Sequence, residues 1–190
     1  MQLERRSVTE SPEFRAHGEN KTLRGYAAVF NSDADIGGSF VERIMPGAFA
    51  NTLKDADVRA LIDHDSGRVI GRTKAGTLRL VEDERGLAVE IDLPDTGDGR
   101  DLATLIERGD IDGMSFGFRV THDEWDETSN PPQRSIHEVQ LREVSAVTWP
   151  AYVDTELAMR SLDRAVKSQK VSGYFKRKAE MAHKVRGIGA

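Results

Sequence analysis

Short apolar runs, separated by glycine and polar residues, recur along most of the chain. In several of them large or β-branched apolar residues alternate with small or polar ones, which is typical of strands with one buried face. The spacing of the runs, about 8 to 12 residues, favours an antiparallel sheet or barrel over parallel βαβ units. The pattern predicts strands at residues 25–30, 58–62, 69–70, 77–81, 87–91, 114–121, 135–141 and 144–148.

Three segments have helical spacing instead. In residues 95–110 the apolar positions Leu102, Leu105 and Ile106 lie on one face, and Gly109 is well placed to end the helix. Residues 45–53 predict a short helix that begins at Pro46. A third helix of modest amphipathicity is expected in residues 156–170.

These elements suggest an α+β fold of one domain in a chain of 190 residues. We expect a flexible N-terminal arm at 1–21, a folded domain at 22–156 and a basic C-terminal helix and tail at 157–190. Residues 160–190 carry nine Lys or Arg and two acidic residues, so this end has a charge of +7 and the rest of the chain −12. An acidic body argues against a nucleic-acid-binding protein.

The composition excludes several kinds of site. The chain has no cysteine, which removes disulfides, thiolate metal sites and a cysteine nucleophile. No phosphate-binding glycine motif is present, and no apolar run approaches the roughly 20 residues of a membrane-spanning helix. The first 20 residues lack the apolar core of a signal peptide, so secretion by that route is not expected. We predict no cofactor and no metal.

Without cysteine, a nucleophile is sought among serines, and Ser115 is the most informative of them. Gly113 and Gly117 on either side leave room for a substrate carbonyl and for backbone N–H donors. A structural serine packed between strands is the alternative. His64, at the polar tip of an apolar strand, is the best-placed general base among five histidines, although it can also be a solvated loop residue.

Glu143 is the candidate for a third, orienting group, because it lies among apolar and small residues where a carboxylate needs a partner. The alternative is a salt bridge at a sheet edge, for example with Arg142 or Arg119. Asp63, His64 and Asp65 together can also be read as metal ligands, but no second element with ligand spacing accompanies them.

Five segments together carry a family resemblance: GYAAVFN, ERIMPGAF, ALIDHD with the following GRT and GTLRL, DLATLIERGDIDGMSFGF, and LREVSAVTWPAY. In this order, from about Gly25 to Tyr152, they resemble the prohead (maturation) proteases of HK97-like tailed bacteriophages. The resemblance implies a serine endopeptidase with a herpesvirus-protease-like fold, mainly an antiparallel β-barrel with surrounding helices, often dimeric.

By the same resemblance, His64 and Ser115 match the histidine and serine of the family's motifs, and Glu143 matches an acidic residue. Assemblins use a second histidine as the third member, so His137 is kept as a weaker candidate. The implied partners are the major capsid protein, with its scaffolding segment, and a possible homodimer. The implied place is the immature capsid in the host cytoplasm, and self-cleavage is expected in the arm and tail. A non-catalytic scaffold protein of the same fold is the alternative.

Overall fold

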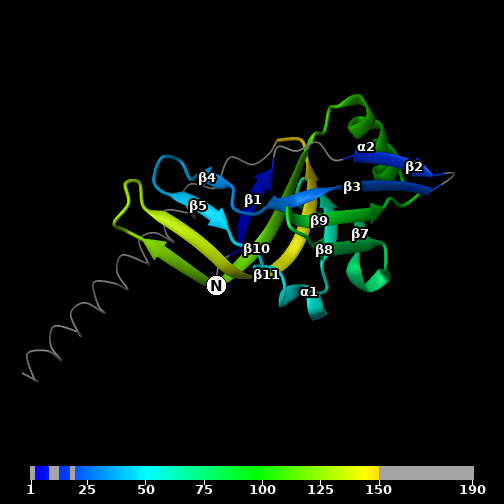
Figure 1. Cartoon of the computed structure of the whole chain (residues 1–190). Coiled ribbons are helices and arrows are strands. Elements are labelled where there is room, and N and C mark those ends of the chain that lie inside the picture. Colours follow the sequence, from blue (N-terminus) through cyan, green and yellow to red (C-terminus); the bar gives the residue numbers. More distant parts are fainter. Residues whose placement is uncertain (1–2, 9–12, 18–19, 150–190) are drawn as a thin grey trace, which may run out of the picture. The chain divides into compact units, whose positions relative to one another are not determined.

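The computed structural model describes residues 3–8, 13–17 and 20–149 (Figure 1). The boundary expected after residue 156 and the basic C-terminal helix and tail at 157–190 lie outside these residues. Most of the described chain is extended, and its strands belong to two sheets.

The larger sheet has seven strands, and β10 and β11 form its long central hairpin (Figure 1). Its main path is β1 (Glu4–Val8), β10 (Gly113–Asp126), β11 (Gln133–Val147), β5 (Val41–Ile44) and β4 (Asp33–Asp35). Beside the other end of β11 lie β6 (Arg59–Ile62) and its antiparallel partner β7 (Asp65–Arg72).

The smaller sheet has four antiparallel strands. In order across the sheet they are β2 (Glu13–His17), β3 (Asn20–Val29), β9 (Gly86–Asp92) and β8 (Leu78–Glu82). Three short helical elements connect the strands: α1 (Thr52–Asp55), the 3₁₀ helix η1 (Thr73–Ala75) and α2 (Gly97–Arg108).

One feature of β11 departs from the predicted topology. It pairs antiparallel with β10 but parallel with both β5 and β6, so the larger sheet is mixed. Within the described residues neither sheet closes on itself. The α+β class with mostly strands is therefore confirmed, whereas a closed antiparallel barrel is not.

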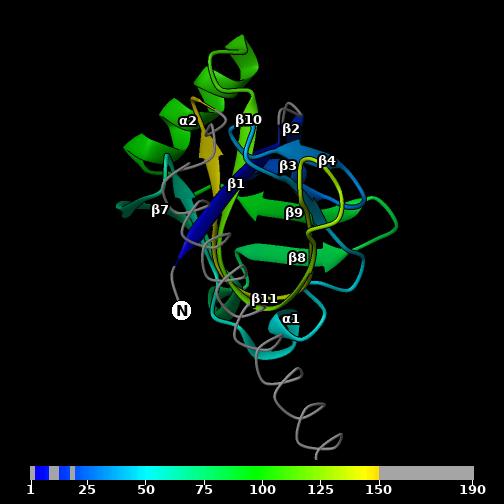
Figure 2. The ribbon, with the colours of Figure 1, turned by 90° about the vertical axis from the view of Figure 1, so that its left-hand side faces the viewer.

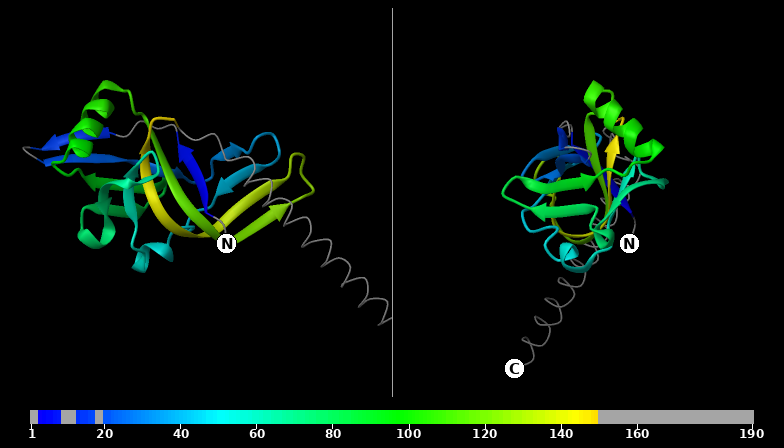
Figure 3. Two further views of the ribbon diagram at one scale, coloured as in Figure 1. Left: turned by 180° about the vertical axis from the view of Figure 1, so that it is seen from behind. Right: turned by 90° about the vertical axis from the view of Figure 1, so that its right-hand side faces the viewer.

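The two sheets share one apolar core. Figures 2 and 3 show the β10–β11 hairpin curving around the β8–β9 pair. Leu87, Val89 and Ile91 of β9 and Phe116 and Phe118 of β10 are all buried in the same cluster. The rings of Phe116 and Phe118 stack with centroids 4.7 Å apart, which places both side chains on the core face of β10.

The helix α2 forms where the apolar spacing predicts it. The hydroxyl of Thr96 accepts a hydrogen bond from the N–H of Gly99, and Gly109 ends the helix with a positive φ of 79°. Leu102, Ala103 and Ile106 form its buried face. This local pattern was sufficient because capping and amphipathicity both reside in the helix itself.

Three expectations differ from the structure. Residues 46–51 form turns, so only the four residues of α1 are helical. The segments 135–141 and 144–148 belong to one strand, β11, up to Val147. The expected flexible arm at 1–21 contains the strands β1 and β2, which pair with β10 and β3. The polar strand β1 could not be recognised from its composition, because its partner β10 lies more than 100 positions further along the chain.

A buried network of charges joins β1 to the larger sheet. Glu4, Arg6, Glu42 and Arg134 are each at most 8% exposed. The guanidinium of Arg134 donates to Glu4 and Glu42 over 2.9 Å and to Asp123 over 2.7 Å. Burial acts to lower the pKa of Arg134, but the charges of Glu42 and Glu4 outweigh it, so the pKa is raised and the guanidinium stays ionised.

We expect Arg134→Met to lower the free energy of unfolding by about 3–5 kcal/mol, because it leaves the two buried carboxylates Glu4 and Glu42 with only one buried guanidinium, that of Arg6. Arg79→Met is the matched control, since Arg79 also bonds two carboxylates, Glu90 and Asp92, but its side chain is 43% exposed. That change is expected to cost less than about 1 kcal/mol. Urea unfolding of both variants measures the difference, and equal losses would contradict a special role of the buried network.

Candidate active site

His64 lies in a tight turn between β6 and β7. Ile62 and Asp65 pair across the hairpin, and the two residues between them have positive φ angles, 48° for Asp63 and 60° for His64. Positive φ at both central positions is the geometry of a type I′ turn, which glycine and asparagine adopt more easily than histidine. The carboxylate of Asp63 accepts hydrogen bonds from the N–H and hydroxyl of Thr148, at 2.8 and 3.1 Å, and holds the turn in place.

The turn directs the imidazole of His64 onto Glu143 of β11. Its Nδ1 lies 2.7 Å from Oε1 of Glu143, and Oε2 of the same carboxylate accepts a 2.6 Å hydrogen bond from the Ser145 hydroxyl. Both Glu143 and Ser145 are buried. A carboxylate fixed on one side by a hydroxyl and on the other by an imidazole orients the ring.

A β-bulge determines the direction of Glu143. Leu141 pairs with Phe118 and Glu143 with Gly117, so Arg142 is the extra residue on β11. Without it, Glu143 would follow Leu141 onto the core face, because side chains alternate along a strand. The bulge turns Glu143 and Ser145 to the opposite face, while Val144 and Ala146 remain in the core.

Gly117 of β10 makes space for this carboxylate. A Cβ at this position would lie 2.3 Å from Oε1 of Glu143, closer than nonbonded atoms approach. The second glycine of the GMSFGF segment, Gly117, is therefore required by a side chain of the neighbouring strand β11.

Ser115 lies on the same face of β10 as Gly117, two residue pairs further along the hairpin. It is the cross-strand partner of Ser145, which in turn pairs with Leu61 of β6, three residues before His64. Ser115 is fully buried, and its hydroxyl donates a 2.8 Å hydrogen bond to the carbonyl oxygen of Arg6 on β1. Ser115 and Gly117 lie on the face of β10 opposite the stacked rings of Phe116 and Phe118, because side chains alternate along a strand.

The second nitrogen of His64 has the properties of a proton acceptor. Its Nε2 is buried and has no hydrogen-bond partner within the described residues. Because Glu143 accepts from Nδ1–H, the neutral ring carries its proton on Nδ1 and leaves a lone pair on Nε2. An oriented imidazole with an unpartnered nitrogen can perform general base catalysis on a hydroxyl group within its reach.

The other predicted residues lie elsewhere. His137 is six positions before Glu143 on β11, about 20 Å along an extended strand. Its ring lies 5.3 Å from that of His122 and its Nε2 is 3.5 Å from Glu124. Asp65 accepts a bond from the N–H of Gly67. Among the described residues no group of three acidic or histidine side chains could hold a metal ion.

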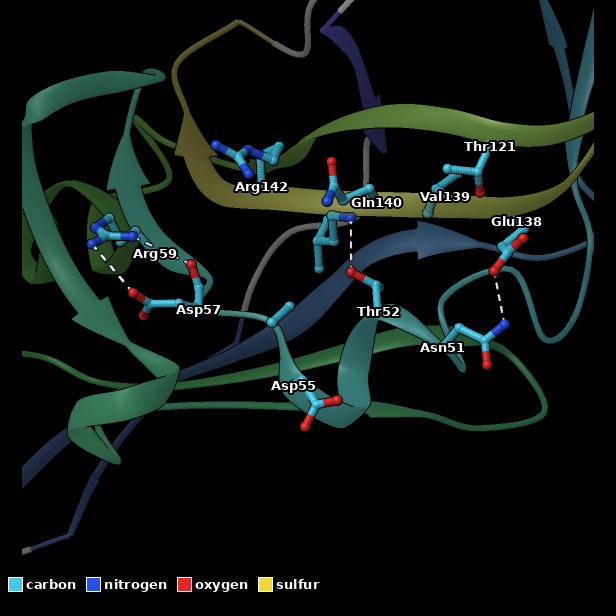
Figure 4. Close-up of a pocket in the computed structure, with 12 residues that line it drawn as sticks. Asn51, Thr52, Asp55, Asp57, Arg59, Thr121, Glu138, Val139, Gln140 and Arg142 are labelled. Carbon is cyan, nitrogen blue, oxygen red and sulfur yellow. Dashed lines mark hydrogen bonds and ion pairs between the residues drawn. The ribbon is translucent and has the colours of Figure 1, made fainter. Parts of the chain in front are cut away.

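A separate cavity of about 600 Å³ lies between α1 and the outer side of β11 (Figure 4). Asn51 donates to Glu138 at one end, and Asp57 pairs with Arg59 at the other. Both charge signs line it, and His64, Ser115 and Glu143 are not among the lining residues. The cavity is therefore distinct from the serine–histidine cluster.

Two residues of this cluster were missed by the sequence analysis. Ser145 follows Glu143 by two positions, which is the spacing of one face of a strand, and this signal was present in the EVS segment. The contact of Arg6 with Ser115 had no local signal, because 109 positions separate the two residues.

The chain is similar in sequence to two prohead proteases. The chain is 35% identical over 159 residues to the prohead protease of Enterobacteria phage HK97, covering 79% of this chain and 65% of that protein. It is 32% identical over 108 residues to the prohead protease of Escherichia phage T5, covering 57% of this chain and 47% of that protein.

A solved structure shares the fold. The bacteriophage T4 capsid assembly protease matches with a TM-score of 0.54 at 14% identity, over 78% of this chain and 98% of that one. Within the described residues no helix is long and apolar enough to cross a membrane. The family model of the caudovirus prohead serine proteases matches residues 5–169. The chain therefore belongs to the caudovirus prohead serine protease family.

Proposed function

We propose that this chain is a serine endopeptidase of capsid maturation, with Ser115 as nucleophile, His64 as general base and Glu143 as the residue that orients His64. The observation that carries the proposal is the 2.7 Å contact between His64 Nδ1 and Glu143, which leaves Nε2 of His64 without a hydrogen-bond partner among the described residues. Membership of a serine protease family supports the same assignment.

In this mechanism His64 Nε2 takes the proton of the Ser115 hydroxyl as Oγ attacks a peptide carbonyl. The resulting imidazolium is stabilised by the Glu143 carboxylate, which Ser145 holds in place. His64 then donates the proton to the leaving amine, and an acyl-enzyme forms on Ser115. Water, activated by the same imidazole, hydrolyses the acyl-enzyme.

The proposed substrates are the scaffolding part of the major capsid protein and the protease itself, inside the immature capsid of a host cell. Two relatives that carry the name prohead protease support this setting. A homodimer and a relation to the herpesvirus assemblin barrel are also proposed. The strong curvature of the β10–β11 hairpin around β8 and β9 (Figure 2) is compatible with a barrel that is open on one side.

We expect Ser115→Ala to abolish cleavage, with a loss of at least about 10³-fold, because no other group replaces the nucleophile. Intact-mass spectrometry of the wild type and the variant, each incubated alone and after co-expression with the major capsid protein, measures this. Ser135→Ala is the matched control, a partly buried serine on β11. It should cleave like the wild type.

Cleavage by Ser115→Ala at the wild-type rate would assign the chemistry to another group. Uncut capsid protein and an unchanged mass in both proteins would favour the non-catalytic scaffold.

Glu143→Gln is expected to reduce the cleavage rate by about 10²- to 10⁴-fold, because a neutral amide neither stabilises the imidazolium nor fixes the Nδ1–H tautomer. His137→Ala tests the alternative third residue and should leave the rate unchanged. Rates are measured from the appearance of the same fragments by mass spectrometry. A large loss with His137→Ala and none with Glu143→Gln would reverse the assignment.

Gly117→Ala is expected to reduce cleavage by about 10- to 100-fold while the protein remains folded, because the added methyl group displaces the Glu143 carboxylate from its position beside His64. Gly97→Ala is the control, since a Cβ there meets no atom within 4 Å. Circular dichroism verifies folding in both. Wild-type activity of Gly117→Ala would show that the position of Glu143 is unimportant.

A further inference from the structure

The N-terminal strand β1 occupies the free edge of β10 next to the proposed nucleophile. β1 runs beside β10 (Figure 1), and in their antiparallel register Arg6 pairs with Phe116 and Ser7 with Ser115. The Ser115 hydroxyl lies 2.8 Å from the carbonyl oxygen of Arg6. An extended segment that adds to a sheet edge is a common mode of peptide recognition. The carbonyl group of the peptide bond after Arg6 therefore lies within hydrogen-bond distance of the Ser115 hydroxyl.

The side chain of Arg6 enters a site built for a guanidinium. It is buried, and its Nε and Nη2 donate to the two oxygens of Glu42 over 2.5 and 2.8 Å. The ring of Phe118 lies 5.7 Å from the guanidinium carbon. A bidentate bond of this kind requires the planar fork of arginine, which a lysine ammonium does not reproduce.

A second contact selects the residue two positions earlier. Glu4 lies on the same face of β1 as Arg6, and its carboxylate accepts from Arg134 over 2.9 Å. Asp123 and Glu42 hold Arg134 from other directions. A strand at the edge of β10 is therefore contacted at two positions. Glu42 binds an arginine, and Arg134 binds a carboxylate two residues before that arginine.

We propose that this edge is the substrate-binding groove, that β1 occupies it as an internal copy of the substrate, and that Glu42 selects an arginine immediately before the scissile bond. The substrate class is an extended segment with an acidic residue, any residue, and arginine, as in Glu4-Arg5-Arg6. This inference rests on the proposed function and specifies its substrate.

The reaction is hydrolysis of the bond after the arginine. The Ser115 Oγ forms a bond to the arginine carbonyl carbon, the C–N bond to the next residue breaks, and the proton from Oγ passes through His64 to the leaving amine. The hydroxyl of a water molecule then bonds to the carbonyl carbon, the bond between that carbon and Oγ breaks, and the remaining proton of the water passes through His64 to Oγ. The products are a segment that ends in arginine and one that begins with a free amine.

Arg5 supplies a matched control within the same strand. It pairs with Gly117 on the opposite face from Arg6, and its side chain is exposed. A change of charge at Arg5 therefore leaves the contact with Glu42 in place, whereas the same change at Arg6 removes it.

The test uses a fluorescently labelled peptide of residues 1–10, MQLERRSVTE, with the full chain. We expect the wild type to cut it between the sixth and seventh residues. A peptide with Arg6→Gln should be cut about 10- to 100-fold more slowly, because it removes the bidentate bond to the buried Glu42. A peptide with Arg5→Gln should be cut at the unchanged rate. With the Glu42→Gln protein, the ratio of the cleavage rates of the wild-type peptide and the Arg6→Gln peptide should fall toward one.

A binding measurement tests the occupancy of the groove by β1. Two proteins are compared, each carrying Ser115→Ala together with either Arg6→Gln or Arg5→Gln. Because Arg6→Gln weakens the docking of the chain's own β1, the wild-type peptide should bind to the Arg6→Gln protein at least about tenfold more tightly than to the Arg5→Gln protein. Fluorescence anisotropy gives the affinities, and thermal melting verifies that both chains are folded. This measurement shows whether β1 and an added peptide compete for the same edge of β10.

Several results would overturn the inference. Equal cleavage of the two variant peptides, cleavage at another bond, or equal binding to both chains would each do so. If capsid protein or the chain itself is cut in a Ser115-dependent manner while the peptide is not, only this inference fails. If no Ser115-dependent cleavage occurs anywhere, the proposed function fails as well.

Discussion

The single extra residue at Arg142 is the constraint on which the candidate site depends. It shifts the β10–β11 register between Gly117 and Phe118, so Leu141 and Val144 both face the core. Glu143 consequently points away from the core toward His64. A bulge re-aims side chains without interrupting the strand, and it is often found beside functional sites. The rigid hairpin thus supplies both an apolar surface for the core and a polar row for chemistry.

The polar row is assembled from elements that are far apart in sequence. β10 contributes Ser115, β11 contributes Glu143 and Ser145, and the turn after β6 contributes His64. The parallel pairing of β6 with β11 positions the turn, and Asp63 anchors it to Thr148. Since each contact fixes a different element, the orientation of the imidazole does not depend on the flexibility of a long loop.

Charge plays a second part at the edge of the larger sheet. A free edge such as that of β10 is open to added strands, and proteins generally cover or charge such edges. Here β1 covers it, and the buried pairs of Arg6 with Glu42 and of Glu4 with Arg134 fix its register. Removal of any one charge would leave another buried without compensation, which makes the register specific. The same contacts bring a peptide bond beside Ser115.

The sequence by itself determined the mostly extended α+β class, the helix α2 with its glycine end and the strand end that carries His64, because each depends on neighbours within a few residues. It also singled out Ser115, His64 and Glu143. Only the tertiary structure decided that β11 pairs in parallel with β5 and β6, that Glu143 contacts His64 rather than an arginine, and that β1 covers Ser115. The physical reason is that strand pairing and buried charge pairs join residues separated by 36 to 130 positions, and local patterns contain no record of such partners.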